Sequence, residues 1–102
     1  MSAGVRYSFT KQNVDNSPAS RGVYALFDGD ELIYVGRANG ETVTIRSRLQ
    51  RHFSGEEGQC TQMATHYMVE VCANPVEREA ELLKDYQWEH NGWRPRCNEV
   101  MP

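Results

Sequence analysis

Residues 22–36 read GVYALFDGDELIYVG, and this stretch decides the fold of the chain. Two apolar runs of strand-like composition, 22–27 and 31–36, flank the polar residues 28–30, a pattern that predicts a β-hairpin with a glycine-containing loop. If the loop is residues 28–30, Tyr24 lies directly opposite Tyr34, and the two side chains share one face of the sheet with Cβ atoms about 5 Å apart. A two-residue loop would place them on opposite faces, so their contact depends on the register.

The rest of the pattern adds one strand and two helices. Apolar residues at helical spacing, preceded by Thr44 as a suitable N-cap, predict the first helix. The polar stretch 54–62 reads as a loop, and alternation over 64–73 predicts a third strand. A second helix is predicted from about Pro75 to about Asn91, with Gly92 as its stop. The order β-β-α-β-α predicts an α+β fold: a small three-stranded antiparallel sheet flanked by helices.

Length and composition predict a single domain over residues 1–102, in which 22–98 carry the motifs and 1–21 form an N-terminal extension. No apolar stretch approaches the ~20 residues of a membrane span, and no signal peptide is apparent, so we expect a cytoplasmic protein without a membrane partner. Cys60, Cys72 and Cys97 are scattered and odd in number, which predicts neither a disulfide framework nor a zinc site and suits a reducing compartment.

The net charge of -3 argues against a generic nucleic-acid binder, but the basic residues are clustered. Residues 37–52 contain four arginines against one glutamate, and two more arginines follow near the end of the chain. Such a cluster can hold one or two phosphates even on an acidic protein. The alternative is an ordinary solvated face, above all for Arg51. The arginines concerned are Arg37, Arg46, Arg48, Arg51, Arg94 and Arg96.

Glu79 falls in the middle of the apolar face of the second predicted helix. At about 100° per residue, the side chains nearest to it around the helix are Leu82, Leu83, Tyr86 and His90. Glu81 falls on the opposite, polar side and would replace Glu79 only if the helix register differed. A lone carboxylate on a buried face is costly unless it is paired with a cation or a metal. Both a metal ligand and an ion pair with an arginine therefore remain open for Glu79.

Five elements, in this order, resemble the GIY-YIG nucleases. Gly22-Val23-Tyr24 and Tyr34-Val35-Gly36 resemble the two tripeptides of the family name, with valine in place of both isoleucines. Arg48-Leu49-Gln50-Arg51-His52 is similar to the family's Arg-Leu-x-x-His element. Residues 79–84 are similar to the helix that carries its metal-binding glutamate, and residues 94–98 to its closing Pro-x-x-Asn. The resemblance covers about three quarters of the chain.

The resemblance implies a metal-dependent endonuclease that hydrolyses DNA phosphodiester bonds, with one Mg²⁺ or Mn²⁺ ion. It also implies a role for each matched residue. Glu79 would hold the metal, Tyr24 would be the general base, and Tyr34 would support that phenol or contact the phosphate. A base role for Tyr24 requires nearby cations to lower its pKa from about 10. Arg48 would stabilise the transition state, His52 would orient groups or assist proton transfer, and Asn98 would organise the site.

The chain departs from the family pattern in three places. The segments between Tyr34 and Arg48 and between Glu79 and Asn98 look long, and Arg37 stands where lysine is common. Arg37, Arg46 and Arg51 are the candidate DNA phosphate contacts. Family members usually gain specificity from appended domains, so a protein partner or the DNA structure, as in repair or recombination, would supply it here. The alternative is a non-catalytic module that keeps the fold and binds nucleic acid or protein, its aromatic residues serving only as packing.

Overall fold

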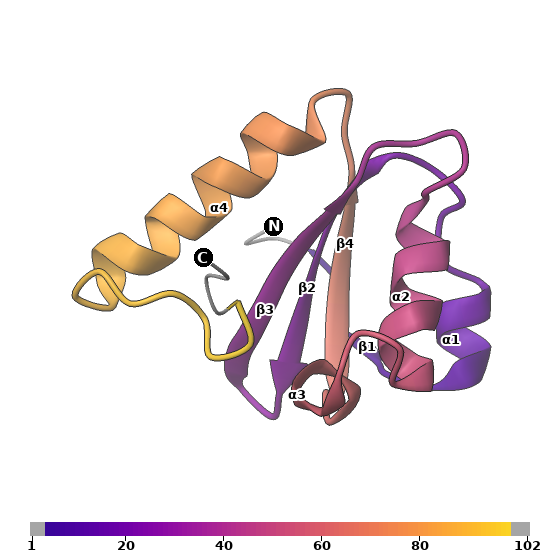
Figure 1. Ribbon diagram of the computed structural model, residues 1–102, viewed down its shortest axis with the longest axis horizontal. Coiled ribbons are helices and arrows are strands. Elements are labelled where there is room, and N and C mark those ends of the chain that lie inside the picture. Colours follow the sequence, from indigo (N-terminus) through magenta and orange to yellow (C-terminus); the bar gives the residue numbers. More distant parts are fainter. Residues whose placement is uncertain (1–3, 99–102) are drawn as a thin grey trace.

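The computed structural model describes residues 4–98, which form an antiparallel four-stranded sheet with helices on both faces (Figure 1). The strands lie in the order β1-β4-β2-β3. Helices α1 and α2 cover one face of the sheet and α4 lies along the other. In chain order the elements are β1 (Tyr7–Ser8), α1 (Lys11–Asp15), β2 (Gly22–Asp28), β3 (Glu31–Ala38), α2 (Ile45–Ser54), α3 (Gln59–Gln62), β4 (His66–Val71) and α4 (Pro75–Glu89).

The α+β class is confirmed, but the sheet has one strand more than predicted. Tyr7 pairs with Tyr67 and Ser8 with His66, which makes residues 7–8 a short edge strand. Two residues are too few to show an alternating pattern, so this strand could not be predicted from the sequence. The predicted loop at 54–62 likewise contains the one-turn helix α3. No helix within residues 4–98 combines the length and hydropathy that crossing a bilayer requires.

The β2–β3 hairpin has a two-residue turn, so the predicted three-residue loop is wrong. Asp28 pairs with Glu31 across the turn. Farther along, Leu26 pairs with Tyr34 whereas Phe27 pairs with Leu32, so Ile33 is an extra residue in β3. This β-bulge shifts the side-chain alternation of β3 by one position.

The bulge keeps the two key tyrosines on one face of the sheet. Tyr24 pairs with Gly36, and Tyr34 lies two residues from that partner on the same face. The ring centroids of Tyr24 and Tyr34 are 6.1 Å apart. The predicted proximity of the phenols is therefore confirmed, whereas their direct opposition is wrong, because the bulge compensates for the shorter turn.

Each face of the sheet carries its own apolar cluster. The larger one lies under α1 and α2 and comprises Phe9, Val14, Tyr24, Leu26, Ile33, Ala38, Ile45, Leu49, Ala64 and Tyr67. The smaller one, on the face covered by α4, comprises Ala25, Phe27 and Met68, with Leu32 packed against it. A groove of about 470 Å³ remains between this face and the Leu82 and Tyr86 side chains of α4.

Both long helices begin where the sequence predicts. Thr44 caps α2 by accepting a hydrogen bond from the backbone N–H of Ser47, whose hydroxyl accepts one from the Thr44 N–H. Gly55 ends this helix in the left-handed conformation, with φ 87°. Helix α4 starts at Pro75 and ends at Glu89, two residues before the predicted end. The two helices are thereby fixed at the positions that supply site residues.

The expectation that the cysteines form no disulfide is wrong for one pair. Cys60 in α3 and Cys97 near the end of the described chain form a disulfide with a Cα–Cα distance of 5.7 Å. Cys72 is a free thiol. The two bonded cysteines are 37 residues apart, and only the tertiary fold brings α3 beside the C-terminal segment. The same segment is attached to the sheet, because the Cys97 N–H donates to the Ile33 carbonyl at 2.7 Å.

Candidate active site

A cleft of about 500 Å³ lies at the free edge of β3, where the layers on the two faces of the sheet meet. Tyr34 enters it from the face covered by α2, and Arg48 comes from α2 itself. Arg37 enters from the opposite face, and Glu79 comes from α4. The loop between β3 and α2, residues 39–43, closes one side. The cleft therefore gathers a phenol, two guanidinium groups and a carboxylate from four elements.

Glu79 is turned toward the sheet, as its place on the helix predicts. Its side chain is 17% exposed, and its Oε1 accepts a hydrogen bond from Arg37 Nη1 at 2.7 Å. Glu81, the fallback candidate, is 65% exposed and pairs with Arg78 on the outside of the helix. The ion pair with an arginine that the sequence left open for Glu79 is thus present. It engages one of the two carboxylate oxygens.

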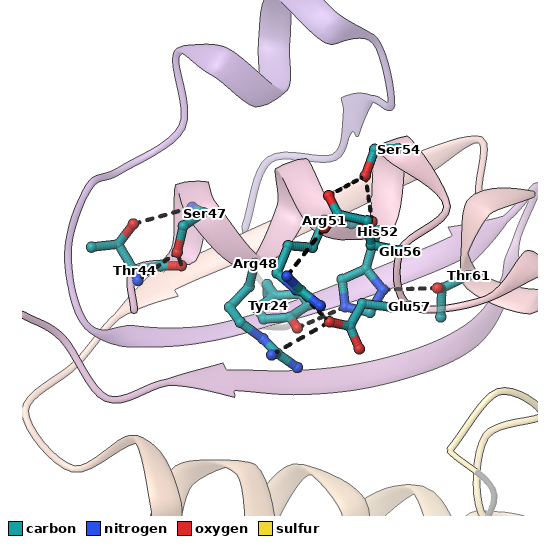
Figure 2. Close-up of polar contacts among 10 residues, drawn as sticks. All are labelled: Tyr24, Thr44, Ser47, Arg48, Arg51, His52, Ser54, Glu56, Glu57 and Thr61. Atoms are coloured by element: carbon teal, nitrogen blue, oxygen red, sulfur yellow. Dashed lines mark hydrogen bonds and ion pairs between the residues drawn. The ribbon is translucent and has the colours of Figure 1, made fainter. Parts of the chain in front are cut away.

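Arg48 carries a buried donor without an acceptor. Its Nε is buried and has no hydrogen-bond partner within residues 4–98. Its Nη1 lies 3.7 Å from Glu57 Oε2, as the ion pair in Figure 2 shows. A buried unpaired N–H costs about 1–3 kcal/mol. The neighbouring Tyr24 hydroxyl interacts with the same guanidinium group. Because Arg48 lines the cleft, an anionic oxygen is the acceptor that suits it.

Tyr24, His52 and Thr61 form a buried hydrogen-bonded chain behind the cleft (Figure 2). The Tyr24 hydroxyl lies 2.8 Å from His52 Nε2, and His52 Nδ1 lies 2.7 Å from the Thr61 hydroxyl. Tyr24 is 0% exposed and His52 1% exposed. In the tautomer protonated at Nδ1, His52 donates to Thr61 and accepts from Tyr24. The polar side-chain atoms of Tyr24, His52 and Thr61 then all have a partner.

Burial keeps both members of this pair neutral. It raises the pKa of Tyr24 above its ordinary value of about 10, and neighbouring Tyr34 adds to this, whereas the charge of Arg48 acts in the opposite direction. The lowering of the Tyr24 pKa that the sequence interpretation requires is therefore not found. Burial, followed by the charge of Arg48, lowers the pKa of His52 to about 4. At neutral pH, Tyr24 is therefore a protonated phenol and His52 a neutral imidazole whose Nε2 can accept the phenol proton.

Gly36 is required by the close approach of both phenols. A Cβ atom at this position would lie 2.5 Å from the Cζ and hydroxyl oxygen of Tyr24 and 2.7 Å from Cε2 of Tyr34. Such distances are far below van der Waals contact. The glycine that ends the Tyr-Val-Gly motif therefore leaves the space in which the two rings meet.

The two tyrosines occupy different positions relative to the cleft. Tyr34 lines it, and its ring centroid lies 4.9 Å from that of His52. Tyr24 is fully buried and lies behind this lining. Tyr34 is thus the phenol that a molecule in the cleft meets first, and Tyr24 connects inward to His52.

Three other candidate residues lie outside the cleft: Asn98, Arg46 and Arg51. Asn98 accepts from the Val35 N–H at 2.7 Å and donates to the Val35 carbonyl at 2.9 Å, which satisfies the free edge of β3. Arg46 donates from Nε to the Ser17 carbonyl at 2.8 Å.

Arg51 pairs with Glu56 and Glu57 and lines a neighbouring hollow that it shares with Arg48. Of the three candidate phosphate contacts, the cleft therefore contains Arg37. Arg51 lies beside it and Arg46 is held against the segment that follows α1.

Sequence reasoning missed two residues that support the site. Thr61 fixes the His52 ring, and Glu57 holds Arg48 and Arg51 together. The Arg51 hydrogen bond and both nearby positive charges lower the pKa of Glu57, which keeps this carboxylate ionised. Both residues lie in a stretch that the sequence marks only as polar. No local pattern distinguishes them from its other polar residues.

The donor set suits a metal that needs few protein ligands. Within residues 4–98, no group of three or more His, Cys, Asp or Glu side chains is placed to hold a metal ion. Mg²⁺ often binds through one or two carboxylates and keeps its waters, and substrate phosphates complete its shell. Glu79 in the cleft offers one such carboxylate. A one-carboxylate Mg²⁺ or Mn²⁺ site fits these residues, whereas an all-protein cage does not.

Comparison with curated proteins finds a relative over part of the chain. UvrABC system protein C of Deinococcus radiodurans is 35% identical over 79 residues, which make up 72% of this chain. The chain spans 12% of the length of that protein. No family model matches the chain, and no solved structure matches it. The partial likeness agrees with the GIY-YIG resemblance of the motifs.

Proposed function

We propose that this protein is a divalent-metal-dependent endonuclease that hydrolyses DNA phosphodiester bonds. The observation that carries the proposal is the cleft that brings Arg48 and Glu79 together. The buried Nε–H of Arg48 has no hydrogen-bond acceptor within residues 4–98. A phosphate oxygen is the acceptor that would satisfy this donor and match the guanidinium charge. The likeness to a UvrABC system protein supports DNA repair as the setting.

Arg48 and Arg37 would neutralise charge on the reacting phosphate. Glu57 holds the Arg48 guanidinium from the side, which reduces the reorganisation needed when the phosphate binds. Arg37 lies on Glu79 Oε1 and can turn to a phosphate oxygen once that carboxylate binds a cation. Glu79 would hold one Mg²⁺ or Mn²⁺ ion, which when bound supplies charge neutralisation and help for the departing oxygen. Asn98 would keep the strand edge beneath Tyr34 fixed through Val35.

The phenols and His52 would remove the proton of the attacking water. Tyr34 lines the cleft and would orient that water, with His52 and Tyr24 behind it. A neutral Tyr24 can accept a hydrogen bond while its own proton passes to His52 Nε2, which lies 2.8 Å from the Tyr24 hydroxyl oxygen. His52 is neutral at pH 7 and therefore available as the acceptor. The pair acts as one base, in place of a free phenolate at Tyr24.

The test is cleavage of labelled paired, single-stranded, nicked and branched DNA with Mg²⁺ or Mn²⁺. Glu79→Gln removes the charge and keeps the shape, so we expect metal-dependent cutting to be lost while the domain stays folded. Glu81→Gln is the matched control on the exposed side of α4 and should cut at the wild-type rate. Equal cutting by both variants, or no cutting by folded wild type, would refute the proposal.

The second candidate is a non-catalytic module that binds nucleic acid or protein. The ion pair of Glu79 with Arg37 favours it, because a carboxylate satisfied by an arginine needs no metal to explain its burial. In that case Glu79→Gln should lower the free energy of unfolding, and Arg37→Gln should lower it equally. Retention of the unpaired Arg48 donor favours the nuclease.

A further inference from the structure

The end of α4 and the turn after it carry two exposed tryptophans. Trp88 is 89% exposed and Trp93 is 75% exposed. Two hollows of about 570 and 650 Å³ flank them and share Gln87 and Gly92. Indole rings of this size are usually buried, and an exposed pair indicates a binding surface. We call this surface, made by residues 84–96, the tryptophan corner.

The tryptophan corner is held in shape by its backbone. Gly92 N–H donates to the Gln87 carbonyl at 2.7 Å, and the Gln87 side chain donates back to the Gly92 carbonyl at 3.1 Å. Trp93 N–H donates to the His90 carbonyl at 3.0 Å. Asn91 and Gly92 adopt positive φ of 55° and 86°, which makes the turn that separates the two rings. A preorganised surface of this kind loses little entropy on binding.

The chemistry of the corner selects a planar, hydrogen-bonding, anionic ligand. The rings stand beside the amides of Gln87 and Asn91 and beside Lys84 and Arg94. Neither Lys84 nor Arg94 forms an ion pair with another residue of the described range 4–98. Asp85 is the acid among the lining residues.

The other exposed large apolar side chains between residues 4 and 98 lie elsewhere: Val5, Tyr7, Val43, Met63, Val71 and Val76. The corner therefore lacks the aliphatic surround that an apolar protein partner would need. Aromatic rings beside cations and amides instead match nucleobases on a phosphate backbone.

We propose that the tryptophan corner binds unpaired nucleotides of the DNA substrate by stacking them on Trp88 and Trp93. This inference rests on the proposed nuclease function and names the substrate class: duplex DNA with an unpaired segment close to the cleavage position. Trp88 lies nine residues after Glu79 on α4, about 13.5 Å along the axis and half a turn around it. That rise equals about four base-pair steps at 3.4 Å each. An unpaired strand can bend around the helix over this distance, whereas a duplex is stiff.

The two tryptophans of the sequence both lie in the corner, so tryptophan fluorescence reports on this surface alone. The protein carries Glu79→Gln to prevent cutting, and the probes are a duplex with a short single-stranded flap and the same duplex fully paired. We expect the flapped duplex to quench the fluorescence and bind tighter. Trp88→Ala or Trp93→Ala should weaken flap binding about fivefold to 150-fold, the range for one stacked base, and leave binding of the paired duplex unchanged.

The control variant is Val76→Ala, an exposed apolar residue at the other end of α4, which should bind both DNAs as the parent does. Equal quenching by both duplexes, unchanged flap affinity in both tryptophan variants, or no DNA binding would overturn the inference. Its failure is distinct from failure of the nuclease proposal. Cutting that depends on Glu79 but not on the tryptophans would leave the nuclease standing without the corner. Flap binding that depends on the tryptophans in a protein that cuts no DNA would support the tryptophan corner and refute the nuclease proposal.

Discussion

His52 should make the fold sensitive to mild acid. Its pKa is about 4 in the folded protein against about 6.5 for an exposed histidine. As the pH falls below about 6.5, His52 becomes protonated in the unfolded chain but stays neutral in the folded protein. The free energy of unfolding therefore decreases until the pH reaches about 4. A shift of about 2.5 pKa units at 1.36 kcal/mol each corresponds to about 3 kcal/mol of unfolding free energy. Small domains have about 5–15 kcal/mol in total, so the loss is large.

The assay is urea unfolding at pH 7.0 and pH 4.5, with wild type beside His52→Gln. Glutamine can donate to Thr61 and accept from Tyr24 but does not titrate. Carboxylates whose pKa is lowered in the folded state without a contribution from His52, such as Asp15 and Glu70, lose their contribution in both proteins and cancel in the comparison. We expect wild type to lose about 2.5 kcal/mol more than the variant between the two pH values.

Equal losses in the two proteins would refute the reasoning. They would mean that His52 takes up its proton as readily in the folded protein as in the unfolded chain. In that case burial among Tyr24 and Thr61 does not disfavour the protonated imidazole, and the acid sensitivity of the fold has another source.

Three further perturbations test other contacts. Gly36→Ala should lower the free energy of unfolding by about 1–3 kcal/mol and slow cleavage, because the added methyl group overlaps both phenols; urea unfolding and single-turnover rates would show whether these effects occur together. Reduction of the Cys60–Cys97 disulfide should lower stability by up to about 4 kcal/mol for a loop of 37 residues, and unfolding with and without dithiothreitol measures this. Tyr24→Phe should cost about 1–3 kcal/mol by leaving His52 Nε2 without a partner, whereas Tyr34→Phe should slow cleavage with little loss of stability; equal stability of the two variants would argue against the buried pair.

Long periodic segments of the fold were predictable because their burial pattern is local. The start of α2 follows from Thr44 and the spacing after it, and α4 follows from Pro75 and Gly92. The hairpin was predictable as an element, but its register was not. The bulge at Ile33 depends on how β3 pairs with β2 and packs in the folded protein, and no residue of the turn predicts it.

The candidate site divides in the same way. Glu79 could be selected from its place on an amphipathic helix, and the structure places it toward the sheet beside Arg37. Thr61, Glu57 and the Cys60–Cys97 disulfide depend on how the segment around α3 folds back on α2 and the sheet edge. Contacts between segments far apart in sequence leave no local pattern, so these residues were found only in the structure.

The cleft takes its parts from two clusters of unequal size, and this division has a consequence for how activity is lost on heating. Tyr34 and Arg48 rest on the larger cluster, whereas Glu79 is carried by α4 over the smaller one. Detachment of α4 would remove the carboxylate and leave most of the domain intact. Inactivation should therefore occur at a lower temperature than melting of the sheet, and cooling should restore activity without refolding of the whole protein.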